Sequence, residues 1–215
     1  MPEYKTNIGP FQNVAASSDY RVNIGPYQGG FAATITEQST GVTKNLYDPV
    51  EFYVVAIGTP TPTYQWYKDD VLIPGETDST LTFEVDTDSG GSYTCIATND
   101  AGSDESDPMV LSIVPEILTQ SQSQSVQAGQ HLMLAVVAVG HPSPTYQWYK
   151  DDVLIPGETS SVLDFYVSDI GIHAYTCTVE NAVGSVESDP IVITSVPNSN
   201  MYNIFNLPID LAREG

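Results

Sequence analysis

The chain has 215 residues and a formal net charge of −21, with 27 acidic side chains against 6 lysines and arginines. A surface this acidic repels phosphate backbones, which argues against nucleic-acid binding. No run approaches the roughly 18 apolar residues that a membrane-spanning helix needs, so we expect no membrane insertion.

The first thirty residues contain a short repeat with an offset of sixteen residues, because Tyr4–Gln12 recurs as Tyr20–Gln28 around the shared motif Asn-Ile-Gly-Pro. Such a segment is too short to bury much of its own surface. Its start also lacks the basic and apolar regions of a signal peptide, so we expect no secretory signal. We therefore predict that residues 1–30 are an extended docking arm. Its predicted contact residues are Tyr4, Ile8, Pro10, Phe11, Tyr20, Ile24, Pro26 and Tyr27.

A longer repeat of 82 residues organises the rest of the chain. The sixteen residues from Pro62 to Thr77 recur without a change from Pro144 to Thr159. A fixed period of this length indicates two copies of one small domain. We place the domains at residues 31–115 and 116–197, with Pro115 and Glu116 as a short, stiff junction.

Each copy has the pattern of a β domain. Short apolar runs end at Gly and Pro, as in Glu51–Gly58 and His131–Gly140, and Leu81, Phe83 and Val85 alternate with polar residues. This alternation predicts strands with one buried face. The tail, residues 198–215, contains Met201, Tyr202, Ile204, Phe205, Leu207 and Ile209. We regard it as a second candidate for docking, because it is too apolar for a solvated end.

At the level of motifs the two copies resemble immunoglobulin-like domains of the intermediate type. The motifs of the first copy are Gly58-Thr-Pro60-Thr-Pro62, Trp66-Tyr67-Lys68-Asp69, Leu81-Thr-Phe83 and Tyr93-Thr-Cys95-Ile-Ala97-Thr-Asn99-Asp-Ala-Gly102. The second copy repeats them from Gly140 to Gly184. The resemblance covers about residues 33–197. It implies an all-β fold of two tandem β-sandwiches, flanked by the arm and the short tail.

The resemblance also implies which residues form each core. Trp66 and Trp148 are expected as core tryptophans, and Tyr93 and Tyr175 as tyrosine corners. The family's first cysteine is replaced here by Val54 and Val136, so a contact with Cys95 or Cys177 would stand in for the inter-sheet disulfide. A second departure is the motif before the corner, which is displaced in the first copy and largely lost in Asp169–Tyr175.

We find no candidate for catalysis, for a cofactor or for a metal. His131, His141 and His173 share no metal-ligand spacing with a cysteine, and the first copy has no histidine at the equivalent positions. Acidic pairs such as Asp86 and Asp88 lack the spacing of a calcium loop, so solvated loop charge is the preferred interpretation. One cysteine per copy, expected as a buried inert thiol, indicates folding in a reducing compartment.

Two hypotheses about the function of the chain remain. The main hypothesis is a structural virion protein of a tailed bacteriophage, most simply a capsid decoration protein made in the host cytoplasm. Its arm, residues 1–30, or its tail, residues 201–215, would bind the major capsid or another virion protein, and both domains would project from the virion surface. The alternative is an adhesin-like binding module that recognises a host-surface glycan or protein. The repeated segment Tyr67–Thr77 offers a site for it, although its conservation between the copies is also explained by the fold.

Overall fold

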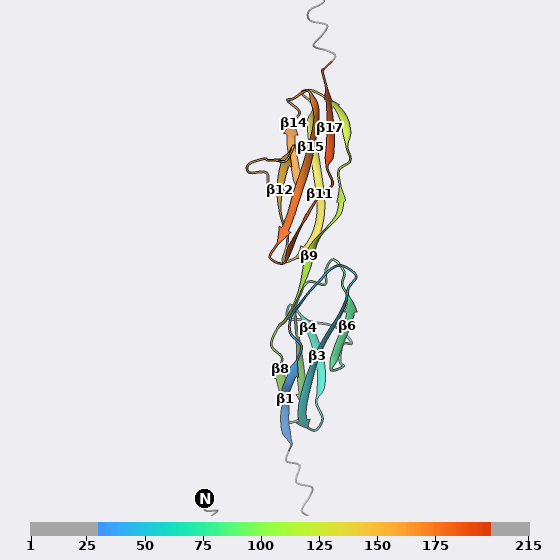
Figure 1. The fold of residues 1–215 in the computed structure, drawn as a ribbon. Helices are drawn as coiled ribbons and strands as arrows, with labels where there is room; N and C mark the ends of the chain where they lie inside the picture. Colours follow the sequence, from blue (N-terminus) through green and yellow to red (C-terminus); the bar gives the residue numbers. More distant parts are fainter. Residues whose placement is uncertain (1–29, 199–215) are drawn as a thin grey trace, which may run out of the picture.

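The computed structural model describes residues 30–198, which form seventeen β-strands and no helix. None of the elements in this range could therefore cross a membrane as a helix. Figure 1 shows a rod of two β-sandwiches placed end to end, with β1 near one end and β17 near the other. The predicted all-β fold of two tandem immunoglobulin-like sandwiches is confirmed.

The first sandwich has two facing sheets, one in the order β1-β3-β6 and the other containing β2, β9, β7, β4 and β5, with β8 paired to β7. Its strands are β1 (Phe31–Gln38), β2 (Val42–Lys44), β3 (Pro49–Thr59), β4 (Thr63–Lys68), β5 (Val71–Leu72), β6 (Thr80–Glu84), β7 (Gly91–Asn99), β8 (Gly102–Glu105) and the start of β9 (Met109–Gln120). The alternating apolar residues of both sheets meet in one core around Trp66.

The second sandwich repeats this arrangement. Its strands are the end of β9, β10 (Gln124–Gln127), β11 (His131–His141), β12 (Thr145–Lys150), β13 (Val153–Leu154), β14 (Val162–Tyr166), β15 (Gly171–Asn181), β16 (Gly184–Glu187) and β17 (Ile191–Val196). One sheet has the order β10-β17-β15-β12-β13, and the facing strands are β14, β11 and β9. The core surrounds Trp148.

A single strand, β9, belongs to both sandwiches. Leu111 and Ile113 pair in parallel with β2 of the first sandwich. Farther along, Glu116 and Gln120 pair antiparallel with β11 of the second. Pro115 and Glu116 thus lie inside a strand, where the sequence suggested a two-residue junction. Proline is tolerated here because β9 is an edge strand of the second sandwich and the register shifts beside Pro115.

The two sandwiches also meet through side chains. Val139 of β11 packs against the core of the first sandwich. The side chain of His141 lies over Gly90, in the loop between β6 and β7, so closely that a Cβ on Gly90 would sit 2.3 Å from the Cβ of His141. Only a glycine leaves room for His141 at this point. The junction is therefore a packed interface as well as a continuous strand.

Candidate interaction surface

The eight core residues predicted from the sequence are all buried. They are Val54, Trp66, Tyr93, Cys95, Val136, Trp148, Tyr175 and Cys177. The indole Nε1 of Trp66 donates to the carbonyl of Asp78 at 2.9 Å, and that of Trp148 donates to Ser160 at 2.8 Å. These bonds satisfy the only polar atom of each indole.

The tyrosine corner forms in the first sandwich and changes in the second. The hydroxyl of Tyr93 donates to the carbonyl of Ser89 at 2.6 Å. In the second sandwich β15 begins two residues earlier, so Gly171 and Ile172 pair with β17. Gly171, the residue equivalent to Ser89, is therefore a strand residue in the second sandwich. The altered motif before Tyr175 thus lengthens a strand and removes the turn that the corner uses.

The two cysteines are free and fully buried. Burial raises the pKa of both thiols to about 11. The backbone N–H of Cys95 donates to the hydroxyl of Ser106 at 2.9 Å, and Cys177 makes the equivalent bond with Ser188. A thiol buried in this way is protonated near neutral pH and is a poor nucleophile.

We expect both thiols to resist alkylation by iodoacetamide at pH 8 in the folded protein and to react rapidly in denaturant. With a pKa of about 11, about one thousandth of each thiol is ionised at pH 8.

The raised pKa also makes the free energy of unfolding depend on pH. Because the folded state raises the thiol pKa above the ordinary value of 9.0, the contribution of the protonated thiols to stability is complete below pH 9 and is lost as the pH rises towards 11. Thiol counting by mass spectrometry, with unfolding curves at pH 8 and pH 10.5, tests both points. Rapid native alkylation would contradict the prediction.

The histidines and acidic loops serve local structure. His131 pairs with Asp164, His173 pairs with Asp151, and His141 packs on Gly90. Asp86 accepts a hydrogen bond from the Ser89 hydroxyl at 2.6 Å, which lowers the pKa of Asp86. Within residues 30–198, His, Cys, Asp and Glu side chains form no group of three or more suited to a metal ion.

The predicted docking arm gives no surface to describe. Its contact residues, Tyr4, Ile8, Pro10, Phe11, Tyr20, Ile24, Pro26 and Tyr27, lie outside the described residues, as does the tail beyond Asn198. The arm therefore remains a prediction from the sequence.

The repeated sixteen-residue block forms a β-hairpin, β4–β5 in the first sandwich and β12–β13 in the second. Its two-residue turn, Asp69-Asp70, has positive φ at both positions, as a type I′ turn requires. Asp69 also accepts a hydrogen bond from the backbone N–H of Ser92 at 2.8 Å. In the second copy Asp151 accepts one from Ala174 at 2.9 Å, and its hydrogen bond with His173 lowers the pKa of Asp151. Both hairpins are thus fixed to the neighbouring strand.

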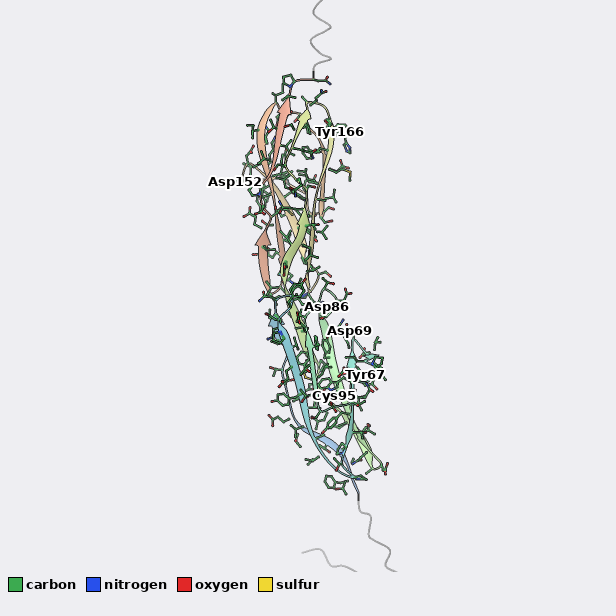
Figure 2. All side chains as sticks on the ribbon, turned by 90° about the vertical axis from the view of Figure 1, so that its right-hand side faces the viewer. Tyr67, Asp69, Asp86, Cys95, Asp152 and Tyr166 are labelled. Atoms are coloured by element: carbon green, nitrogen blue, oxygen red, sulfur yellow. The ribbon has the colours of Figure 1, made fainter. Side chains whose placement is uncertain are left out.

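Each hairpin exposes two aliphatic residues on the edge strand of its sheet. Val71 and Leu72 are 69% and 47% exposed, and Val153 and Leu154 are 68% and 48% exposed. We call these two pairs the hairpin edges. In Figure 2, Tyr67 and Asp69 lie on one side of the rod and Asp152 lies on the other. The sequence pointed to the repeated block, but only the structure separates its exposed pair from its structural residues.

Comparisons with known proteins agree with this fold. A family model described as an immunoglobulin domain matches residues 34–99 and 114–181. Human Roundabout homolog 2 is 29% identical over 157 residues, which is 65% of this chain and 11% of that protein. This chain thus spans a small part of that relative.

Two solved structures show the same tandem fold. The titin Ig tandem domains A164-A165 superpose with a TM-score of 0.56 at 21% identity, covering 79% of this chain and 99% of that one. The complex of Dpr2 Ig1-Ig2 with DIP-Theta Ig1-Ig3 gives a TM-score of 0.52 at 25% identity, covering 78% and 66%. The predicted similarity to bacteriophage decoration proteins finds no support in these matches. Because the family model matches more than half of the chain, this protein belongs to the immunoglobulin-domain family.

Proposed function

We propose that this protein is an adhesion module that binds cell-surface proteins through its two hairpin edges. The observation that carries the proposal is the exposed pair Val-Leu, which both sandwiches present at the same place with nearly the same exposure. Aliphatic residues on an exposed strand edge are unfavourable in water, and they mark interaction sites when they are held in a fixed geometry.

The remaining residues of the repeated block have structural roles that explain why they recur. The side-chain amide of Gln65 donates to the carbonyl of Ile73 at 2.8 Å, and Trp66 fills the core. Asp69 closes the turn. Val71 and Leu72 have no such structural role. Their side chains point away from the core, and their strand, β5, pairs only with β4.

The shape of the hairpin edges favours a protein partner. A strand edge offers unpaired backbone groups together with apolar side chains, which is the combination that an extended segment of another protein can pair with. An acidic turn lies beside each edge, Asp69-Asp70 in the first sandwich and Asp151-Asp152 in the second, and would favour a basic rim on the partner. The solved complex between Dpr2 and DIP-Theta is an association of immunoglobulin domains with immunoglobulin domains, and this supports protein recognition by the fold.

The positions of the two hairpin edges favour a protein that bridges two partners. Because the labelled hairpin residues lie on opposite sides of the rod in Figure 2, the edges are not directed towards one flat surface. Two independent sites that point apart can hold two separate partners. Such an arrangement links surfaces, as adhesion requires.

The test measures binding of the chain to a panel of bacterial and animal cells by flow cytometry, with and without prior protease treatment. We expect V71S/L72S and V153S/L154S each to leave one functional site, so each variant binds cells but no longer aggregates them. The fourfold variant should lose at least about tenfold in binding. V55S/V137S removes two exposed valines from the other sheet and should behave as the parent. Unchanged binding by the fourfold variant would refute the site. Binding that survives protease would refute a protein partner and indicate a glycan.

A further inference from the structure

A cavity of about 270 Å³ lies between the two sheets of the second sandwich. Its apolar wall includes Leu163 and Phe165 of β14 and Ile193 of β17. Its polar groups come mainly from β15 and β17, which are neighbours in one sheet (Figure 1). A cavity of roughly 150 Å³ is enough to bind benzene, so this one has room for a molecule with a single ring.

Two buried polar atoms in the cavity wall have no hydrogen-bond partner within residues 30–198. They are Oγ of Ser195, whose residue is 3% exposed, and Nε2 of His173. Gly171 is directly opposite Ser195 in the pair of β15 with β17, and Nε2 of His173 lies 3.5 Å from the place of a Cβ on Gly171. Because the Cβ atoms of paired residues are about 4.5–5.5 Å apart, the Ser195 hydroxyl and the imidazole nitrogen lie side by side. Two such atoms favour a ligand that forms hydrogen bonds with both.

The hydrogen bond between His173 and Asp151 determines what such a ligand must offer. Nδ1 of His173 lies 2.7 Å from Oδ2 of Asp151, and this bond lowers the pKa of Asp151, so Nδ1 donates and the carboxylate accepts. In a neutral imidazole the other nitrogen, Nε2, is then an acceptor. The hydroxyl of Ser195 can both donate and accept. A single hydroxyl group on the ligand satisfies both atoms, because it can donate to Nε2 while it accepts from Ser195.

The internal repeat shows that these polar atoms are specific to the second sandwich. The residue equivalent to Ser195 in the first sandwich is Ile113, which is 1% exposed, and the residue equivalent to His173 is Gly91. The fold therefore does not require a hydroxyl or an imidazole at these positions, since the first copy forms the same sandwich with an aliphatic residue and a glycine.

A second core position also differs between the copies. Phe52 of the first sandwich packs against Tyr93, with ring centroids 5.2 Å apart. The equivalent residues of the second sandwich are Leu134 and Tyr175, and Tyr175 lines the cavity. The second sandwich thus has a smaller side chain facing the tyrosine ring, which leaves space beside that ring.

The charges around the cavity disfavour an anionic ligand. Lys150 lines the cavity, but its ammonium group is already paired with the carboxylate of Asp169 at 2.5 Å. Glu158 lines the cavity as well, and Asp151 is bonded to His173. Carboxylates therefore outnumber the one lysine, and a negatively charged ligand would be repelled.

We propose that this cavity binds a small neutral molecule with one aromatic ring and a hydroxyl group, that is, a simple phenol. The hydroxyl would donate to Nε2 of His173 and accept from the Ser195 hydroxyl. The ring would pack against Phe165 and Tyr175, whose own rings are 5.0 Å apart and tilted by 32°. This site uses no residue of the hairpin edges, so it is a binding activity beyond the proposed adhesion function.

The test titrates the isotopically labelled full chain with para-cresol and follows the imidazole nitrogens of His173 by NMR. We expect a saturable shift of Nε2, with a dissociation constant of about 1 mM or lower. Two matched compounds test the chemistry of the ligand. The O-methyl ether of para-cresol keeps the ring but cannot donate a hydrogen bond, and para-toluate carries a negative charge. Both should bind at least about tenfold more weakly than para-cresol.

Two substitutions of Ser195 test the site. Ser195→Ile installs the residue of the first sandwich and fills part of the cavity, so para-cresol binding should fall at least about tenfold while thermal unfolding shows a folded protein. Ser195→Ala keeps the space and removes only the hydroxyl, so it should reduce the preference for para-cresol over its ether. V55S/V137S, which alters exposed valines outside the cavity, should bind para-cresol as the parent does.

Several results would overturn the proposal. One is the lack of a saturable shift at His173 up to roughly 10 mM para-cresol. Equal binding of the ether would show that the two polar atoms do not select the ligand, and tighter binding of para-toluate would show that the ligand is not neutral. Unchanged binding by folded Ser195→Ile would place the ligand elsewhere. None of these results depends on binding to cells, so this proposal and the proposed adhesion function can fail separately.

Discussion

Replacing Val54 by cysteine is expected to form an inter-sheet disulfide with Cys95 and to raise the free energy of unfolding of the first sandwich by about 2–4 kcal/mol. Val54 lies on β3 and Cys95 on β7, in opposite sheets, and both are buried in the core that contains Trp66. A bond between them would restrict the unfolded chain. Val136→Cys provides the equivalent change beside Cys177 in the second sandwich.

Denaturant unfolding of oxidised V54C, with and without dithiothreitol, measures the effect. The gain should disappear on reduction, and mass spectrometry should show the loss of two hydrogens on oxidation. Val54→Ser, which removes the valine without adding a thiol, controls for altered packing and should be destabilised under both conditions. Two titratable thiols in V54C after oxidation would show that the Val54 and Cys95 positions are not in bonding geometry.

Replacing Gly90 by alanine is expected to disrupt the junction between the sandwiches and to lower stability by about 1–3 kcal/mol. The added Cβ would lie 2.3 Å from the Cβ and 2.5 Å from the Cγ of His141, so rotation of the ring alone cannot relieve the clash. Either the loop or β11 must move. Small-angle scattering should then show a broader distribution of interatomic distances, because the rod can bend at the junction.

The double variant G90A/H141A tests whether the clash with His141 causes the loss of stability in G90A. If the clash with His141 is responsible, the second substitution should recover most of the lost stability, as a double-mutant cycle would show. Ile172→Ala, at the position equivalent to Gly90 in the second sandwich, should leave the scattering profile unchanged. A G90A protein with the scattering and stability of the parent would contradict the packed junction.

Most of the fold can be predicted from the sequence because its signals are local. Leu81, Phe83 and Val85 alternate, the turn residues recur at fixed offsets, and the tryptophan and cysteine of each copy lie in recognisable motifs. Because the 82-residue repeat presents each of these motifs in both copies, each prediction rests on two occurrences of the same pattern. The burial of Trp66, Cys95 and their copies requires no information from distant residues beyond that pattern.

The junction could not be predicted in the same way. Pro115 and Glu116 are left over between the two copies and so suggested a short junction, whereas the structure accommodates Pro115 within β9 through an edge position and a register shift. The role of His141 depends on Gly90, which lies in the other sandwich, and no local pattern connects the two.

The hairpin edges represent an intermediate case. The identity of the block from Pro62 to Thr77 with its copy marked the segment, but an identical sequence does not separate residues that maintain a fold from residues that face a partner. That separation depends on exposure, which for Val71 and Leu72 follows from their place on the outermost strand of the sheet.

The shared strand β9 also determines how the rod would respond to tension. The described ends lie at opposite ends of the rod, so a pull between them draws β2 and β9 of the first sandwich in opposite directions along their length (Figure 1). Because these two strands run parallel, their hydrogen bonds bear the load together instead of opening one after another. β10 and β17 form the same parallel ladder in the second sandwich. With no slack linker between the sandwiches, the force passes directly from one ladder to the next through the backbone of a single strand.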